Sequence, residues 1–323
     1  MIVKRTCVRF IILCVAVLYW PASLAELDNS APLLHVDVIL SHDTSEYQSI
    51  YQAITNNITS SNADSPIINY HLVDQYPPTK KSISKSTNLI VAIGTTATRK
   101  AFSLSINVPI LSIFIPKTNY ISLKNTSNNI VSSAIVLDQP IERYLRLIKL
   151  LFPYDDLKIG LFDDADNTNT NHIHEKFSLF GLLPTIENVK GVITIRNIEK
   201  VINSSDVILL LPEYKYISPH YSKWILYMAY LEKKPIISFS KPYLNSGALG
   251  VIFTDPESIG RQAAKYILDI KASKLLPISY FNSMNDFNYP DSYSYSINEK
   301  TARAMKVPIP NDQHIKDTIN GNK

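Results

Sequence analysis

Short, unbroken apolar runs alternate with amphipathic segments along most of this chain. Leu89–Ile93 and Val207–Leu211 are apolar at every position, which is typical of strands that are covered on both faces of a sheet. Between such runs, residues such as Tyr47, Ile50 and Ile54 recur at helical spacing. Strands that alternate with helices indicate a parallel sheet, so we expect an α/β fold.

The same pattern predicts the elements one by one. The expected strands are Leu34–Leu40, Ile67–Val73, Leu89–Ile93, Val108–Ile115, Ile130–Leu137, Lys158–Phe162, Gly191–Ile195, Val207–Leu211, Pro235–Phe239 and Val251–Phe253. The expected helices begin near Asp43, Ala97, Pro140, Pro219, Pro256 and Asn298. A loosely patterned helix is expected between the strands at 158–162 and 191–195. Pro77–Thr87 is expected to be a solvated connection or a frayed helix, and Lys117–Asn129 has no strong pattern.

Three helix starts carry specific capping predictions. Asp43 and Glu46 have the spacing of a capping box. Thr254 and Glu257 have the spacing of a capping box, with Pro256 in the first turn. Asp138 or Gln139 is expected to cap the helix that begins at Pro140.

This number of strands suffices for two doubly wound parallel-sheet lobes. The predicted division assigns 26–137 and 249–276 to an N-terminal lobe and 138–248 and 277–311 to a C-terminal lobe. Residues 312–323 are expected to form a loose tail. The chain would cross between the lobes three times, near Ser132–Gln139, Tyr243–Gly250 and Pro277–Tyr293.

The first 25 residues have the pattern of a secretory signal peptide. A basic start precedes the apolar segment Phe10–Trp20, which is short for a membrane span, and Ser23–Ala25 supplies small residues for cleavage. We expect a mature chain that begins at Glu26 and resides in the periplasm; an uncleaved anchor is the alternative. No later apolar run approaches membrane-spanning length, so no span is expected after cleavage.

Composition narrows the function classes. Both cysteines, Cys7 and Cys14, lie in the predicted leader, so the mature chain has no disulfide, thiolate nucleophile or cysteine metal site. The whole chain has 32 Lys and Arg against 28 Asp and Glu. Because no basic stripe with interleaved aromatic residues appears, no nucleic-acid partner is expected.

Motifs for catalysis or cofactor binding are missing from the sequence. It contains no G-x-G-x-x-G, P-loop or G-x-S-x-G pattern. The neighbours Ser41, His42 and Asp43 are the residue types of a Ser-His-Asp catalytic triad. Because adjacent residues cannot face one another as the members of a triad must, ligand contacts or a helix cap are favoured here. His172 and His174 lie near several acids, yet an i, i+2 pair does not share a helix face, which favours a hydrated surface over a metal site. We therefore expect no enzyme, no metal and no cofactor.

Ligand contacts are instead expected where strands end. In doubly wound sheets, ligands bind outside the carboxyl ends of the strands. At Gly94-Thr95-Thr96, a strand-to-helix turn with two hydroxyls could hold an anion, or the turn could be an ordinary cap. Tyr214 could contact ligand or pack within a surface loop. The candidate ligand-binding residues are Ser41, His42, Gly94, Thr95, Thr96, Pro116, Asp163, Glu213, Tyr214, Ser240 and Tyr243.

Several blocks carry a family resemblance. They are Leu89–Thr96 (LIVAIGTT), Ala134–Pro153 (AIVLDQPIERYLRLIKLLFP), the stretch Ser205–Leu268 with its Pro-Ile-Ile-Ser-Phe-Ser and Ser-Gly-Ala-Leu segments, and Tyr295–Pro310. In this order they resemble the ABC-transporter substrate-binding protein family, specifically its uncharacterised periplasmic-component group of the type I periplasmic-binding-protein fold. The chain departs from the family's pattern at Pro116-Lys117, where relatives often have Asp-Pro.

The resemblance implies a function and partners. It implies a monomeric clamshell that binds a small solute between its lobes, with an ABC permease and an ATPase as partners. Better characterised relatives bind small amino-acid-like ligands, including aromatic ones. A periplasmic sensory or accessory protein of the same fold, acting with a membrane receptor, is the alternative. A hydrolase or glycosyltransferase would need an acid/base pair or a nucleotide loop, and the sequence shows neither.

Overall fold

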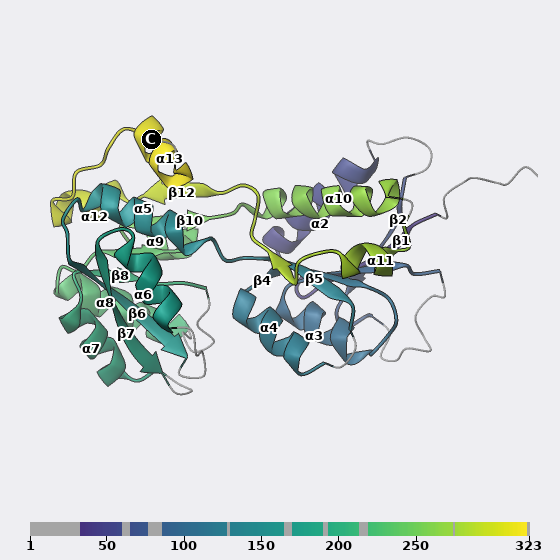
Figure 1. Ribbon diagram of the computed structural model, residues 1–323, viewed down its shortest axis with the longest axis horizontal. Coiled ribbons are helices and arrows are strands. Elements are labelled where there is room, and N and C mark those ends of the chain that lie inside the picture. Colours follow the sequence, from purple (N-terminus) through teal and green to yellow (C-terminus); the bar gives the residue numbers. More distant parts are fainter. Residues whose placement is uncertain are drawn as a thin grey trace, which may run out of the picture. The chain divides into compact units, whose positions relative to one another are not determined.

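The structure is a computed structural model that describes residues 33–59, 65–76, 86–127, 130–164, 170–189, 193–212, 219–273 and 275–321. The predicted leader at 1–25 and most of Pro77–Thr87 lie outside the described residues. The described chain contains two six-stranded sheets, each covered by helices (Figure 1). The predicted α/β class with two doubly wound lobes is confirmed.

The first sheet has the strand order β11-β5-β4-β3-β1-β2, and all its pairs are parallel. Its strands are β1 (His35–Leu40), β2 (Ile67–Leu72), β3 (Leu89–Ile93), β4 (Ile110–Ile115), β5 (Ser132–Val136) and β11 (Phe287–Asn288). The central strand β3 is buried at every position, which explains its unbroken apolar sequence.

Helices cover both faces of this first sheet. They are α2 (Ser45–Thr59), α3 (Thr95–Ser103), α4 (Lys117–Asn125), α10 (Pro256–Ala272) and α11 (Pro277–Asn282). One core joins α2 and α10, which lie side by side, to one face of the sheet (Figure 1). A second core joins α3 and α4 to the opposite face.

The second sheet has the order β12-β10-β9-β8-β6-β7, and β10 pairs antiparallel with β12 while the other pairs are parallel. Its strands are β6 (Leu157–Asp164), β7 (Leu182–Val189), β8 (Val207–Leu209), β9 (Ile236–Ser238), β10 (Gly250–Phe253) and β12 (Ser294–Ile297). The helices that follow or cover these strands are α5 (Ile141–Leu151), α6 (Thr170–Ser178), α7 (Ile195–Ser204), α8 (Pro219–Leu231), α9 (Lys241–Asn245), α12 (Glu299–Met305) and α13 (Asp312–Asn320).

The chain passes between the two sheets three times. The crossings lie between β5 and α5, between β10 and α10, and between β11 and β12. The predicted division differs, because it placed 249–276 in the N-terminal lobe and 277–311 in the C-terminal lobe. In the structure, Gly250–Phe253 pair within the second sheet and Phe287–Asn288 within the first. Short apolar strands do not record in their sequence which sheet they join.

Hydrogen bonds tie the three crossings to one another. The side-chain amide of Gln139 in the first crossing donates to Thr254 Oγ1 in the second, at 2.7 Å. The same Thr254 hydroxyl donates to the backbone carbonyl of Ser292 in the third, at 2.9 Å. Gln139 and Thr254 are both buried, at 5% and 8% exposure, so each side chain depends on these partners for its polar atoms.

These bonds overturn the capping predictions at Thr254 and at Asp138 or Gln139. Helix α10 has Asp255, and not Thr254, at its N-cap, and it has no side-chain cap bond. The Thr254 hydroxyl is used by the crossings, and the Asp255 carboxylate accepts hydrogen bonds from Ser294 and Lys241. Helix α5 likewise has no side-chain cap. Asp138 instead accepts a hydrogen bond from the backbone N–H of Lys117 at 2.7 Å, at the start of α4.

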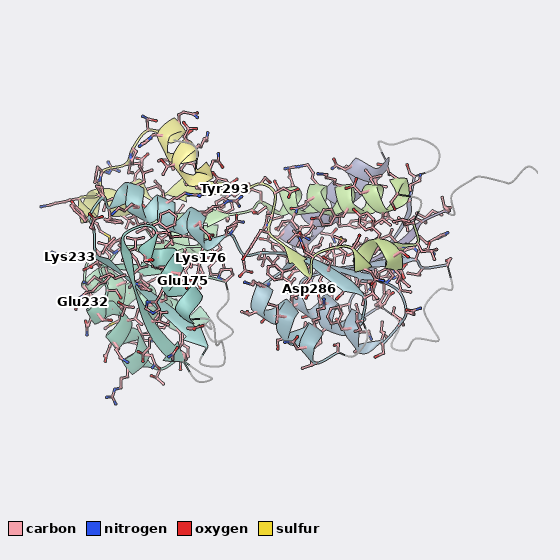
Figure 2. All side chains as sticks on the ribbon, viewed as in Figure 1. Glu175, Lys176, Glu232, Lys233, Asp286 and Tyr293 are labelled. Carbon is pink, nitrogen blue, oxygen red and sulfur yellow. The ribbon has the colours of Figure 1, made fainter. Side chains whose placement is uncertain are left out.

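The third crossing is also anchored on either side. Asp286, labelled in Figure 2, pairs with Lys124 of α4 at 2.6 Å just before β11. Gln262 of α10 donates to the carbonyl of Tyr289 at 3.2 Å and accepts the N–H of Asp291 at 3.0 Å. The crossing therefore runs along a fixed path of hydrogen bonds.

Two further elements differ from the sequence prediction. The strand expected at Gly191–Ile195 is wrong, because Ile195 begins α7 and Thr194 caps that helix through a capping box with Asn197. The strand lies earlier, as β7, where its place at the edge of the sheet tolerates Pro184 and mixed polarity. In 117–129, which had no strong pattern, the structure contains α4.

The loose tail expected at 312–323 is also wrong. Helix α13 begins at the capping residue Asn311, whose side chain accepts the N–H of His314, and ends at Gly321 in the left-handed conformation. Ile315 and Ile319, one turn apart, are buried at 2% and 0% exposure in the core that includes α5. Arg146 of α5 donates to the carbonyl of Ile319 at 3.1 Å.

We predict that Thr254→Val lowers the free energy of unfolding by about 1–3 kcal/mol, because the buried Gln139 amide and the Ser292 carbonyl each lose a partner. Urea unfolding of the variant and the wild-type protein measures this. Thr126→Val is the control, since the exposed Thr126 hydroxyl bonds only within its own helix end among the described residues. Equal unfolding free energies for the two variants would contradict the prediction.

We also predict that Ile319→Ala lowers the free energy of unfolding by about 2–4 kcal/mol, because it opens a cavity in a core that α13 completes. The matched control is His314→Ala, on the exposed side of the same helix. Urea unfolding compares them. A loss below 0.5 kcal/mol, on the order of that seen for surface substitutions, would mean that α13 is not packed on the second lobe.

Candidate functional site

The first group of candidate residues lies at one edge of the first sheet. Ser41 and His42 follow β1, Gly94 follows β3, and Pro116 follows β4; these three strands are neighbours. The backbone N–H of Ser41 donates to Ile93 at 3.0 Å, and that of Gly94 donates to Ile113 at 2.8 Å. The structure therefore brings together the residues that the sequence placed separately at strand ends.

Ser41 has a structural role at this edge. It is 6% exposed, and its hydroxyl donates to the carbonyl of Ile93 at 2.8 Å. The same oxygen accepts the N–H of Ala97 at 2.8 Å, in the first turn of α3. Ser41 thus caps α3 from a neighbouring strand, and both interactions are made inside the protein.

Gly94 is required by this packing. Its φ is 90°, a conformation that favours glycine, and a Cβ placed there would lie 2.6 Å from Ser41 Oγ and 2.8 Å from the Tyr47 hydroxyl. The next residues are more accessible: Thr95 is half-buried and Thr96 is exposed at the N-terminus of α3. The amide of Asn119 on α4 donates weakly to Thr95 Oγ1, at 3.4 Å.

A row of three aromatic rings lies beside Gly94, with Tyr47 in the middle. Tyr47 lies edge to face with His42 and with Phe114, each at 5.4 Å between ring centroids. Burial raises the pKa of Tyr47 above its ordinary value, and the Glu46 carboxylate adds to this, so the phenol stays protonated. Tyr47 was not among the predicted ligand-binding residues, because its spacing marks it as a core residue of α2.

Phe114 was not among the predicted ligand-binding residues either, and its backbone conformation is unusual. Its φ is 55° at a register shift between Ile113 and Ile115. A non-glycine residue in this region costs energy and persists where the surrounding structure requires it. The irregularity turns β4 toward Pro116 and α4, whose first N–H is taken by the buried Asp138 carboxylate. A ligand carboxylate placed at the start of α4 would be repelled by the Asp138 carboxylate.

The second group lies at the ends of strands in the second sheet. Asp163 is near the end of β6, and Ser240 precedes α9 directly after β9. Tyr243 packs its ring on Phe239 at 5.2 Å, and its hydroxyl shares a hydrogen bond with Ser222 at 2.9 Å. Burial raises the pKa of Tyr243, which the bond to Ser222 partly offsets. Glu213 and Tyr214 lie outside the described residues.

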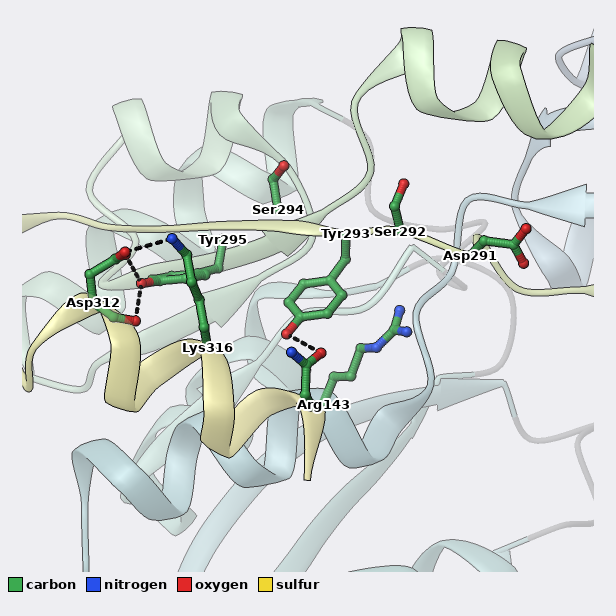
Figure 3. Close-up of a pocket in the computed structure, with 9 residues that line it drawn as sticks. Arg143, Asp291, Ser292, Tyr293, Ser294, Tyr295, Asp312 and Lys316 are labelled. Carbon is green, nitrogen blue, oxygen red and sulfur yellow. Dashed lines mark hydrogen bonds and ion pairs between the residues drawn. The ribbon is translucent and has the colours of Figure 1, made fainter. Parts of the chain in front are cut away.

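Other classes of site gain no support from the described chain. In that part of the molecule, no group of three or more His, Cys, Asp or Glu side chains is arranged to hold a metal ion. None of its helices is long and apolar enough to cross a membrane. A hollow of about 590 Å³ lies elsewhere, between α5, the third crossing, β12 and α13, and none of the predicted ligand residues lines it (Figure 3).

The described chain has two doubly wound sheets joined by three crossings, an architecture in which ligands bind outside the carboxyl ends of the strands. The chain belongs to the family of ABC transporter substrate binding proteins, whose model matches residues 71–313. Proteins of this family are usually extracellular or periplasmic, and they typically bind their ligands without transforming them. The resemblance drawn from the sequence is confirmed. No curated protein matches the chain in sequence.

Solved structures share the type I periplasmic-binding fold. A ligand-free, open substrate binding protein with adhesive properties from Clostridium difficile is 14% identical, with a TM-score of 0.62, covering 87% of this chain and 97% of that one. An ABC domain in complex with L-Trp from Streptococcus pneumonia is 17% identical, with a TM-score of 0.58, covering 88% and 98%. A conserved domain protein from Vibrio cholerae is 16% identical, with a TM-score of 0.55, covering 88% and 98%.

We predict that Gly94→Ala destabilises the protein by about 1–3 kcal/mol more than Gly247→Ala, because an added methyl group overpacks against Ser41 and Tyr47. Gly247 is the matched control: its φ of 110° also disfavours alanine, but nothing lies within 4 Å of the added Cβ. Urea unfolding of both variants separates packing from backbone strain. Equal losses would show that the strand-end edge is loosely packed.

Proposed function

We propose that this chain is the periplasmic substrate-binding component of an ABC-type uptake system. It binds a small solute in the cleft between its two lobes and delivers it to a membrane permease that works with an ATPase. Family membership over residues 71–313 carries this proposal. The protein acts as a monomer and catalyses no reaction. The leader pattern before Glu26 supports export, after which no span would remain.

The solute contacts follow from the strand-end geometry. In the first lobe, His42, Thr95 and Thr96 line an edge that Tyr47 and Phe114 border with aromatic rings. Ser41 and Gly94 shape this edge from behind, through the α3 cap and the close approach of the backbone. A solute with polar groups for the hydroxyls and an apolar part for the rings fits this arrangement.

The second lobe would supply the remaining contacts. The candidates are Asp163, Glu213, Tyr214, Ser240 and Tyr243, together with Pro116 from the first lobe. Among the described candidates, Tyr243 is held in place by Phe239, which packs on its ring, and by Ser222, which bonds its hydroxyl. Contacts to both lobes would make the closed arrangement more stable in the presence of solute, since a ligand shifts the equilibrium by its differential affinity.

A thermal-shift screen of the exported protein tests the proposal, with amino acids, nucleosides, sugars, metal chelates and short peptides as ligands. A true solute stabilises the folded state by about 2.7 kcal/mol at a hundredfold excess over Kd. We expect Thr95→Ala to abolish or reduce this shift, because the Thr95 hydroxyl lies at the strand-end edge. Thr126→Ala, at the exposed end of α4, should retain it.

If the full thermal shift persists in Thr95→Ala, the solute binds somewhere other than this strand-end edge. If the protein is folded and no compound in the screen shifts it, the transport proposal loses its support. The result would then favour a sensory or accessory role with a membrane receptor.

A further inference from the structure

The hollow beside the crossings has the volume of a small-molecule site and a mostly polar lining. Its volume of about 590 Å³ falls in the range of small-molecule pockets, roughly 300–1,000 Å³. It is bounded by α5, the third crossing, β12 and α13, so it exists only because the C-terminal helix packs on the second lobe. Figure 3 shows Arg143, Tyr293, Tyr295, Asp312 and Lys316 around it.

One acid of the hollow, Asp312, is already paired with a cation. Asp312 accepts a hydrogen bond from Lys316 at 2.6 Å, and the Tyr295 hydroxyl donates to the same carboxylate. These partners hold the pKa of Asp312 below its ordinary value, with the Lys316 bond as the larger cause. The cation and the anion of this pair therefore satisfy each other, and neither attracts a charged ligand strongly.

Arg143 has no such partner among the described residues. It is half-buried, its guanidinium donates to the side-chain oxygen of Gln139, and it lies over the ring of Tyr293 at 4.5 Å from the centroid. No described carboxylate lies within ion-pair distance of it. Burial lowers the pKa of Arg143, yet an arginine remains charged in proteins.

A guanidinium that is partly removed from water and has no counter-ion is costly, and its remaining donors match the oxygens of a carboxylate or phosphate. The other acid of the hollow, Asp291, is exposed, so water and salt screen its repulsion of an incoming anion. The Tyr293 hydroxyl is held by Asn320 at 2.8 Å, which keeps the ring over Arg143 in place.

We propose that this hollow binds a small anion with a carboxylate or phosphate group, which pairs with the guanidinium of Arg143. The site is separate from the strand-end residues of the solute site. It reaches the crossings directly: Arg143 bonds Gln139, Gln139 bonds Thr254, and Thr254 bonds the Ser292 carbonyl. Such an anion would act as an effector at the point where the three crossings meet, and not as a transported solute.

Isothermal titration of the exported full-length product with inorganic phosphate and with citrate tests the site, in chloride buffer of matched ionic strength. We expect saturable binding of phosphate, citrate or both, and the one that binds identifies the headgroup. Arg143→Gln should weaken the Kd at least tenfold, and Arg143→Lys should lie between, because lysine keeps the charge and loses the paired donors. The control is Arg261→Gln, an exposed arginine of α10 that pairs with Glu257 outside the hollow.

The proposal is overturned if neither anion binds more strongly than chloride, or if Arg143→Gln keeps the wild-type Kd. If Arg143→Gln does not fold, the wild-type protein still decides the question. Saturating anion should slow the modification of Arg143 by phenylglyoxal, measured by peptide mass, while Arg261 reacts at an unchanged rate. An unchanged rate at Arg143 would also overturn it.

Discussion

The connection between the two lobes depends on one side chain, Thr254. Its hydroxyl accepts a hydrogen bond from Gln139 and donates one to the Ser292 carbonyl, so a single oxygen joins all three crossings. Gln139 and Thr254 are buried, and their polar side-chain groups would be left unsatisfied if the partners moved away. Any rearrangement of one lobe against the other must preserve or replace these bonds. The crossings therefore act as a unit.

The first crossing connects this unit to both candidate sites through consecutive residues. Asp138 holds the start of α4, next to the strand-end edge of the first lobe. Gln139 contacts Thr254 on one side and Arg143 on the other. A solute at the strand ends and an anion at Arg143 would each act on residues adjacent in the chain. Coupling between two ligands needs such a shared element, which both sites can bias.

At the strand-end edge, structural side chains and candidate solute-binding side chains are interleaved. Ser41 and Gly94 are buried and serve the cap and close packing of α3, while Thr95 and Thr96 remain accessible a residue or two away. The left-handed backbone of Phe114 completes the edge by directing its ring toward Tyr47. The location of these candidate residues can be predicted from the position of the turn. Whether each side chain is buried or accessible depends on the packing behind the turn.

The apolar runs and helical spacing by themselves determined the α/β class, most strand positions and the strand-end location of residues such as Thr95, because fully covered parallel strands must be apolar along their length. Elements without that signature were not predicted. The edge strand β7 is of mixed polarity, and α13 gains its stability from two isoleucines packed on the second lobe. The capping-box spacing of Thr254 and Glu257 also predicted a local bond that the structure does not contain. A hydroxyl bonds whichever buried partner the fold presents, and long-range contacts with Gln139 and Ser292 outweighed the local cap. The sheet joined by β10, the role of Tyr47 and the uncompensated charge of Arg143 were likewise decided by tertiary structure, since each depends on neighbours distant in the chain.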